Sequence, residues 1–312
     1  ETPTASGSPV LRDPVFLDIE YVLPSVFLAL VALGAGQPRT GGMVFVDVGA
    51  FEGAVSYAAL ALWDAVVATE PRWPHASAPL DAAPGSRAAS VRVWAVEPDP
   101  GWCSSLDGTG GREGSHLNRS SLRELIAGRL TAVCAAAMSV PDKFLFHYEH
   151  CAEEPERGWS YVTDELRDRK PTCKPPKRVQ PTTVDRLAEE HGISEVGVLK
   201  VDAEGNDLNV LRGARRLLSE RRVRFVIFEV IRDLWVQRGS ASGGWHSGVN
   251  SMLPEALDYL RLHGDYFCFL IGPEFLVPLS GPWLSSVYSD VSHAYNVLCA
   301  PREDPALRAA VL

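Results

Sequence analysis

Three ionisable side chains interrupt an apolar stretch in the middle of the chain. The segment 196–201 reads VGVLKV and is followed by DAEGND, so Lys200, Asp202 and Glu204 occupy alternate positions. In an extended chain, alternate residues lie on one face of the strand. Unpaired buried charges are costly, so these three groups cannot all be ordinary core residues. We predict that Asp202 or Glu204 is a general base that takes a hydroxyl proton, and that Lys200 tunes its pKa or steadies a developing alkoxide.

A structural interpretation of the same residues stays open. Lys200 and Asp202 could form an ion pair while Glu204 caps the following helix. Glu229 ends the next apolar run in the same way. A divalent metal bridging Asp202 and Glu229 is conceivable, because oxygen ligands suit Mg²⁺. The sequence shows no third dedicated ligand, so we predict no metal site.

A glycine-containing turn forms the second candidate site. The run 43–48 reads MVFVDV, which predicts a strand buried on both faces, and it leads into the turn 47–53, DVGAFEG. Gly49 and Gly53 allow a tight turn and a close backbone approach to a ligand. In open α/β sheets, nucleotide-like ligands bind at such strand-to-helix turns. The turn lacks the GxGxxG spacing of a dinucleotide site, which speaks against an NAD-dependent oxidoreductase.

Glu97 is the third candidate, at the end of a strand predicted over 91–96 (VRVWAV). A carboxylate in this place can accept both hydroxyls of a ribose. Glu97 follows Gly53 by 44 positions, against roughly 20 in the dinucleotide pattern. An inserted loop over 69–90, rich in Pro, Ala and Ser, accounts for the excess. The alternative is an exposed glutamate that caps the turn at Pro98.

Strands alternate with helices along the rest of the chain, which predicts a doubly wound α/β fold with a mostly parallel sheet. The last two strands are expected to pair antiparallel at the sheet edge. We predict one domain over 1–312, with a lead-in helix region at 1–40, a catalytic core at 41–300 and inserted loops at 69–90 and 149–181. Further strands are predicted at 130–136, 144–148, 196–201, 223–230, 266–271 and 293–299, and helices at 53–67, 122–128, 183–191, 206–218 and 254–263.

An apolar run at 21–36 belongs to the lead-in region. It contains Pro24 and is shorter than the ~20 residues that a membrane-spanning helix needs. Acidic rather than basic residues precede it, unlike the start of a signal peptide. We therefore predict a buried helix and no transmembrane segment.

The charge and cysteine content limit the partners and the compartment. The formal net charge is −9, and an acidic surface disfavours nucleic acid as a partner. Of the six cysteines, Cys151 with Cys173 or Cys268 with Cys299 could form a disulfide, and buried free thiols are the alternative. One glycosylation sequon begins at Asn118. Together these features favour the secretory pathway, such as the Golgi lumen, over the cytoplasm.

The segments described above resemble the FkbM family of methyltransferases. The resemblance covers about 45–230 and is carried by VFVDVGAFEG, VWAVEPDP, FVIFEV and the stretch TTVDRLAEEHGISEVGVLKVDAEGNDLNVLRGARRLL. Its most distinctive part is Lys-x-Asp-x-Glu-Gly followed by Leu-Arg-Gly-Ala. The resemblance implies a seven-stranded Rossmann-like sheet, S-adenosylmethionine as methyl donor, and O-methylation, often of sugar or natural-product hydroxyls.

The resemblance also implies roles by position. Glu97 would hold the ribose, and Ala135 would lie near the adenine. Two groups of residues would flank the reacting end of the cofactor: Asp47, Gly49, Ala50 and Gly53 on the methionine side, and Lys200, Asp202 and Glu204 by the reactive methyl. The chain departs from the family at Phe51, where Asn is usual, and in its long loop at 69–90.

The sequence therefore predicts an S-adenosylmethionine-dependent O-methyltransferase with a sugar or glycan hydroxyl as acceptor. The alternatives are a natural-product O-methyltransferase and a catalytically silent module that binds a glycan or a protein. His246 is a second candidate base. Trp235 and Trp245, near it, are either a stacking platform for a sugar or packing residues.

Overall fold

The computed structural model describes the strands and helices of the α/β pattern and several of the connections. The described residues are 43–69, 91–106, 123, 125–140, 145–148, 161–163, 175–230, 252–272, 276–285, 288, 294–305 and 307. The apolar run at 21–36, the sequon at Asn118, and Trp235, Trp245 and His246 lie outside them. No helix in the described ranges is long and apolar enough to cross a bilayer.

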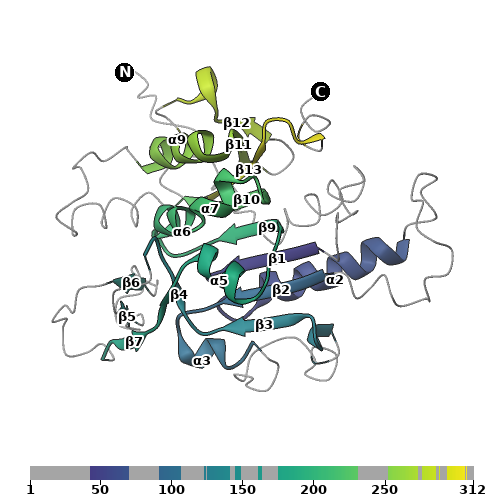
Figure 1. Cartoon of the computed structure of the whole chain (residues 1–312), viewed down its shortest axis with the longest axis vertical. Coiled ribbons are helices and arrows are strands. Elements are labelled where there is room, and N and C mark those ends of the chain that lie inside the picture. The colour runs from purple at the N-terminus through teal and green to yellow at the C-terminus, as the bar shows by residue number, and fades with distance from the viewer. Residues whose placement is uncertain are drawn as a thin grey trace, which may run out of the picture.

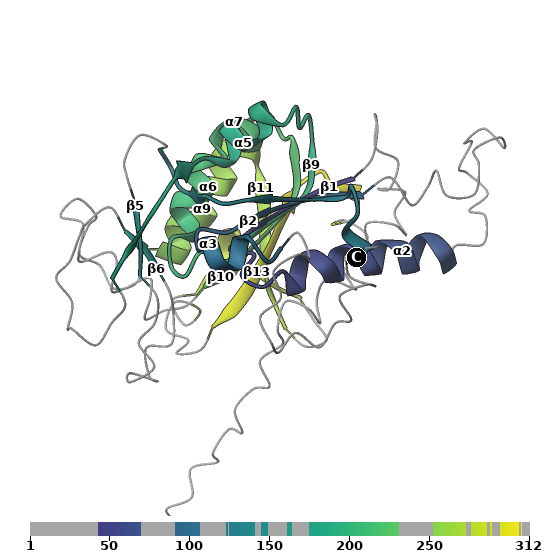
Figure 2. The ribbon, with the colours of Figure 1, turned by 90° about the horizontal axis from the view of Figure 1, so that it is seen from below.

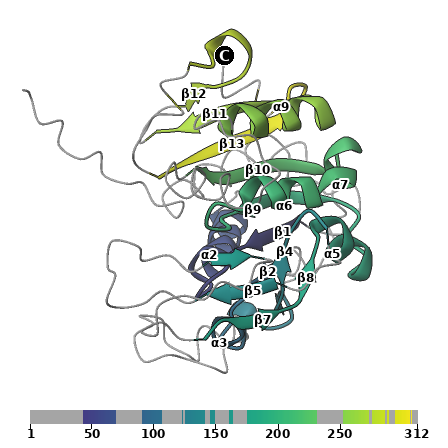
Figure 3. The same ribbon diagram turned by 90° about the vertical axis from the view of Figure 1, so that its left-hand side faces the viewer.

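An eight-stranded sheet forms the centre of the molecule, in the order β12-β11-β13-β10-β9-β1-β2-β3 (Figures 1 and 3). The five strands from β10 to β3 are parallel, whereas β13 runs antiparallel to both β10 and β11, and β12 antiparallel to β11. The predicted fold class is confirmed, and β12 adds an edge strand to the seven expected. The strands are β1 (Met43–Val48), β2 (Val91–Val96), β3 (Leu130–Val133), β9 (Val196–Val201), β10 (Val223–Val230), β11 (Tyr266–Ile271), β12 (Leu276–Pro278) and β13 (Tyr295–Pro301).

Helices cover both faces of this sheet. Figure 2 shows α2 on one face and α5, α6, α7 and α9 on the other. The predicted helix over 206–218 is broken at Ala214, whose backbone (φ −101°, ψ 15°) leaves the helical region between α6 and α7. The helices are α2 (Ala54–Thr69), α3 (Pro100–Cys103), α5 (Val184–Glu190), α6 (Asp207–Gly213), α7 (Arg215–Ser219), α9 (Met252–Gly264) and the short 3₁₀ helix η3 (Gly281–Trp283).

Residue alternation in the central strands explains why both faces are covered. In β1, Val44, Val46 and Val48 pack into the core beneath α5, α6 and α9. Phe45, between them, packs with Leu60 of α2 in a second core on the opposite face. A strand that is apolar at every position can be satisfied only when both faces are buried.

Two small sheets lie beside the main one, and they correct the predicted connections. The predicted strand over 130–136 leaves the main sheet at Val133 and restarts in β4, because the chain turns through Ala135. The region 149–181, predicted as a loop, supplies β6, β7 and part of β8, whose short polar segments carry no clear periodicity of their own. The pairs are β4 (Ala136–Ala137) with β8 (Pro181–Thr182), and β5 (Leu145–Tyr148) between β6 (Tyr161–Thr163) and β7 (Lys177–Val179).

Two disulfides join described cysteines. Cys268 and Cys299 are register partners on β11 and β13, so this predicted possibility is found. Cys103 of α3 is bonded to Cys134, which follows β3. That pair was not predicted, because nothing in the sequence placed Cys103 near Cys134. Cys151 and Cys173 lie outside the described residues.

Candidate functional site

A cavity of about 320 Å³ lies where β1, β2 and β9 end. Its lining includes five residues proposed from the sequence: Gly49, Glu97, Ala135, Asp202 and Glu204. The other four, Asp47, Ala50, Gly53 and Lys200, are not part of this lining. The cavity thus brings together the ends of three neighbouring parallel strands, which is the usual position of a ligand site in an open α/β sheet.

The turn after β1 is fixed by close backbone contacts. Gly49 has φ +77°, and a Cβ added to it would lie 1.7 Å from the carbonyl oxygen of Asp202. Its N–H donates to the carbonyl of Val96 over 2.9 Å. Glycine is required here both by its backbone conformation and by the lack of space. The turn therefore bridges β2 and the segment after β9 at the floor of the cavity.

Glu97 is anchored by the backbone around it. Its Oε2 accepts the N–H of Phe51 and its Oε1 accepts the N–H of Asp99, each over 2.8 Å. The residue is only 5% exposed, yet it lines the cavity. Burial raises the pKa of Glu97 to about 7, against the lowering effect of the two N–H donors. The exposed-cap interpretation is therefore excluded, since the carboxylate is buried in the cavity wall.

Asp47 and Lys200 form a buried pair behind this wall. The Lys200 ammonium lies 3.1 Å from Asp47 Oδ1 and donates to the carbonyl of Gly49, also over 3.1 Å. Ser56 donates its hydroxyl to Asp47 Oδ2 over 2.6 Å. Burial alone would lower the pKa of Lys200, but the carboxylates of Asp47 and Asp202 raise it above its ordinary value, so the ammonium stays charged. The pair thus connects β1 and β9 directly beneath the glycine turn.

Carboxylates gather on the β9 side of the cavity. Lys200 Nζ lies 3.5 Å from Asp202 Oδ2, so the predicted alternation holds for these two, and Asp202 is 34% exposed. The chain then turns, and Glu204 enters the cavity lining with φ +51°, a conformation uncommon for a residue other than glycine. Asp207 holds this turn by accepting the N–H groups of Ala203 and Gly205, over 3.5 and 3.2 Å.

Glu229, at the end of β10, completes the group. Burial raises its pKa, and the charges of Asp202, Asp207 and Glu204 raise it further. Glu229 also hydrogen-bonds to Asp202 in a way that favours the protonated acid. The structure therefore places Glu229, whose pKa is raised, beside Asp202. No group of three or more metal-ligating side chains occurs in the described parts of the chain.

The small sheet contributes residues that the sequence analysis missed. His147 of β5 lines the cavity, and its Nδ1 lies 3.5 Å from Asp99 Oδ2. Lys177 of β7 donates to the same oxygen over 2.8 Å, and Asp99 Oδ1 caps α3. Burial opposes ionisation of Asp99, but Lys177 and the N–H of Trp102 hold its pKa below the ordinary value. The sequence Asp99-Pro100 is a helix-start signal that would have found α3, whereas nothing in it pointed to His147.

Ala135 begins the apolar wall of the cavity, which continues through Ala136, Ala137 and Met138. Gly213, the glycine of the Leu-Arg-Gly-Ala motif, packs against this wall from behind. A Cβ at Gly213 would lie 2.0 Å from the carbonyl oxygen of Met138. This close approach supplies a physical reason for a glycine inside α6.

The chain is similar to known proteins through a family profile and two solved structures. A sequence profile of the Methyltransferase FkbM domain matches residues 47–267. No curated protein matches the chain. A solved structure of methyltransferase FkbM from Methylobacillus flagellatus is 15% identical, with a TM-score of 0.42 over 87% of this chain and 47% of that one, so this chain spans about half the length of that protein. Precorrin-6y C5,15-methyltransferase from Geobacter metallireducens is 12% identical, with a TM-score of 0.34 over 88% and 87%.

The profile match includes the glycine turn, Glu97, the apolar wall and the charged segment after β9. It extends over more than half of the 312 residues. The chain belongs to the FkbM family of methyltransferases.

Proposed function

We propose that the chain is an S-adenosylmethionine-dependent O-methyltransferase that acts on a hydroxyl of a sugar or glycan. The observation that carries the proposal is Glu97: a buried carboxylate at the end of β2, held by two backbone N–H groups, in the wall of a cavity. A carboxylate in this place suits the paired hydroxyls of a ribose. Membership in a methyltransferase family supports methyl transfer as the reaction.

The residues around the cavity fit an adenosyl ligand. Glu97 would hold the ribose, and the apolar wall from Ala135 to Met138, with Pro98 nearby, would receive a flat heteroaromatic ring. Gly49 allows the backbone to approach the methionine part closely. When bound, S-adenosylmethionine would supply a methyl group on a sulfonium that already carries a good leaving group.

The chain's own residues would then have to position the acceptor and remove its proton. We propose Asp202 or Glu204 as the base, because both line the cavity. Lys200 is 2% exposed and is engaged by Asp47 and the Gly49 carbonyl, so we propose that it acts through the glycine turn as a positioning residue. The same applies to Asp47, which lies behind the cavity wall.

The charges around the cavity and the disulfides bear on the acceptor and the compartment. Carboxylates at the β9 side of the cavity repel anions, which favours a neutral, hydroxyl-rich acceptor such as a sugar over a phosphorylated one. The two disulfides support an oxidising compartment, such as the secretory pathway. A single domain remains our proposal for the organisation of the chain.

Calorimetric titration with S-adenosylmethionine and S-adenosylhomocysteine tests the cofactor site. We expect micromolar binding of both ligands by the native chain. The Glu97→Gln variant keeps the size of the side chain but loses the charge, and we expect binding at least tenfold weaker. Circular dichroism would establish that the variant is folded. No binding by the well-folded native chain would reject the proposal and favour a catalytically silent binding module.

A transfer assay tests the base separately. Methyl-labelled S-adenosylmethionine would be offered with a panel of neutral glycans, and label in the glycan would be measured. We expect Asp202→Asn or Glu204→Gln to reduce the transfer rate about 100-fold or more. The affinity for S-adenosylhomocysteine should stay nearly unchanged. Full transfer by both variants would exclude these two carboxylates as the base.

A further inference from the structure

Phe51 adopts a backbone conformation that does not suit its side chain. Its φ is +49°, in the left-handed region that bulky residues rarely occupy. Its ring is also 50% exposed, so this strained residue does not serve the hydrophobic core. Strained residues of this kind persist where the surrounding structure imposes them, and they cluster at ligand sites.

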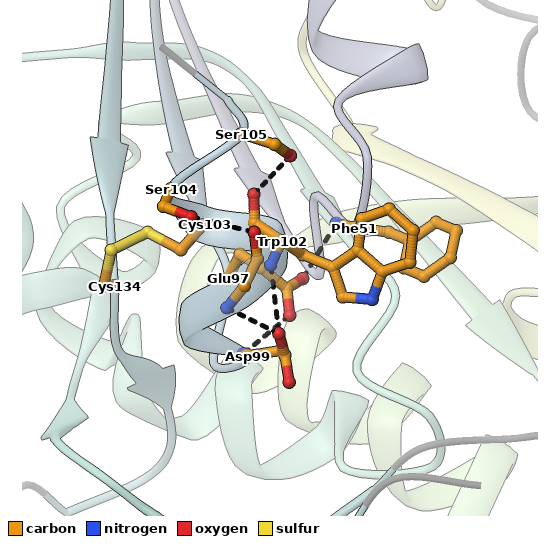
Figure 4. The surroundings of a disulfide bond; sticks show 9 residues. Phe51, Glu97, Asp99, Trp102, Cys103, Ser104, Ser105 and Cys134 are labelled. Atoms are coloured by element: carbon orange, nitrogen blue, oxygen red, sulfur yellow. Dashed lines mark hydrogen bonds between the residues drawn. A yellow bond between two sulfur atoms is a disulfide. The ribbon is translucent and has the colours of Figure 1, made fainter. Parts of the chain in front are cut away.

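The surroundings of Phe51 fix the position of its ring. The ring lies against Trp102 of α3, with the two ring centroids 4.2 Å apart (Figure 4). Trp102 is held in turn by Asp99, whose Oδ1 accepts the backbone N–H of Trp102 over 3.0 Å, and by the disulfide of the neighbouring Cys103. The exposed ring is therefore part of a supported aromatic pair.

The same ring borders the candidate ribose site. Phe51 lines the cavity, and its N–H donates to Glu97 Oε2. The backbone of Phe51 is hydrogen-bonded to the carboxylate of Glu97. A ligand that also hydrogen-bonds to Glu97 would therefore lie within reach of the Phe51 side chain. A ligand that covers an exposed apolar ring at such a place removes the ring from water, and this favours binding.

We infer that Phe51, supported by Trp102, is a cofactor-binding residue that forms an aromatic wall against the adenosyl group. This inference rests on the proposed function, since it uses the same cavity. It explains why a phenylalanine is kept in a left-handed turn: the residue lowers the stability of the unliganded protein and strengthens binding. A residue that only packed on Trp102 would stabilise the fold and would leave binding unaffected.

Two substitutions separate these roles. Phe51→Asn and Phe51→Gly both relieve the left-handed strain, because glycine and asparagine visit this region most readily. We expect a melting temperature equal to or higher than that of the native chain. We expect S-adenosylhomocysteine to bind about tenfold more weakly in calorimetry, through loss of the contact between ring and ligand.

Matched controls complete the test. Trp283→Ala removes another exposed aromatic residue, 62% exposed, on η3, and we expect it to leave the affinity unchanged. Trp102→Ala removes the support of Phe51, and we expect weaker binding than in the native chain. Native affinity in both Phe51 variants would overturn the inference, as would a lowered melting temperature with unchanged affinity. Absence of binding by the native chain would instead reject the proposed function itself.

Discussion

Two regions of the molecule use the same stabilising devices for different ends. The cavity region comprises residues 47–53, 97–106, 134–138 and 200–207; the edge region comprises residues 223–230, 252–271 and 295–304. Each contains a disulfide between cysteines 31 positions apart, an ion pair with a buried aspartate, and a glycine without room for a Cβ. In the edge region these devices lie along antiparallel strands and at the end of a helix, whereas in the cavity region they surround the turns that follow β1, β2 and β9.

The difference indicates where stability and function compete. The turns of the cavity region keep buried carboxylates and two non-glycine residues with positive φ, Phe51 and Glu204, whereas the edge region has one such residue, Asp265. Such features lower stability and persist at functional sites. We therefore expect matched changes to lower stability in both regions, and only those in the cavity region to weaken cofactor binding beyond any effect on folding.

The largest effect is expected at Gly49. In Gly49→Ala the new Cβ would overlap the backbone of Asp202, and the positive φ would be strained as well. We expect a loss of about 4 kcal/mol or more in the free energy of unfolding, and no measurable S-adenosylhomocysteine binding. Chemical denaturation and calorimetry would measure both quantities.

Gly264→Ala is the matched control in the edge region. Its Cβ would meet the Tyr266 ring at 2.3 Å and the Leu218 carbonyl oxygen at 2.6 Å. We expect a smaller loss of about 1–3 kcal/mol from overpacking, with the affinity retained in the folded fraction. Equal loss of binding in the two variants would contradict the comparison.

The second prediction concerns the buried ion pairs. Lys200→Met removes the ammonium from the fully buried carboxylate of Asp47, to which Ser56 still donates its hydroxyl. Removing one member of a buried pair costs about 3–5 kcal/mol. Because the ammonium also holds the Gly49 carbonyl, we expect weaker S-adenosylhomocysteine binding at a temperature where the variant is folded.

Arg224→Met provides the control for that pair. The guanidinium lies 2.7 Å from Asp304, but its side chain is 25% exposed, so solvent screens the interaction. We expect a loss of about 1 kcal/mol and native affinity. If Lys200→Met bound S-adenosylhomocysteine as tightly as Arg224→Met does, the positioning role of Lys200 would be wrong.

The four adjacent strands at the centre of the main sheet could be predicted from the sequence to the residue. Strands β2, β9 and β10 begin and end where predicted, because an apolar run buried on both faces is bounded by polar residues or turns. Of the small sheets, only β5 was predicted, as a strand over 144–148. Their strands have two to four residues, and they form only because distant segments meet, as in the pairing of His147 with Lys177.

The candidate site likewise has features that the local sequence predicts and features that depend on contacts between distant segments. Glu97 and the segment from Lys200 to Glu204 were found because ionisable groups at strand ends are conspicuous. The local sequence could not show that Lys200 faces Asp47 instead of the cavity, since this depends on the register between β1 and β9. The Cys103–Cys134 disulfide was missed for a similar reason, because it depends on where α3 packs.

The third prediction sharpens the comparison between the two disulfides. Each closes a loop of the same length, so chain entropy predicts a similar cost of about 3.7 kcal/mol for removing either one. The double variant Cys103→Ser/Cys134→Ser would break the link between α3, which carries Trp102, and the segment that leads into Ala135. We expect it to weaken S-adenosylhomocysteine binding several-fold at a temperature where the protein is folded.

Cys268→Ser/Cys299→Ser is the matched variant, and we expect it to lower stability while leaving the affinity as in the native chain. Calorimetry on both variants, with denaturation curves for each, makes the comparison. Equal affinities in the two double variants would show that the disulfide near the cavity serves stability alone.

The smallest effect is a pH dependence that arises from Glu97. Its pKa is raised from 4.5 to about 7 by burial, so between these values the folded protein holds a proton that the unfolded chain releases. This contribution to stability is complete below pH 4.5 and is lost as the pH rises through 7. Binding should follow the opposite trend, because the ionised carboxylate is the better acceptor for ribose hydroxyls.

From pH 6 to pH 8 the ionised fraction of a group with pKa 7 rises about tenfold, so we expect up to a tenfold gain in S-adenosylhomocysteine affinity. Calorimetry at these two pH values, corrected for buffer ionisation, would measure it. Asp99 and Lys200 also act on the charge of Glu97, and both stay ionised across this range. Glu97→Gln should therefore bind weakly at both pH values. A gain of the same size in that variant would assign the titration to another group.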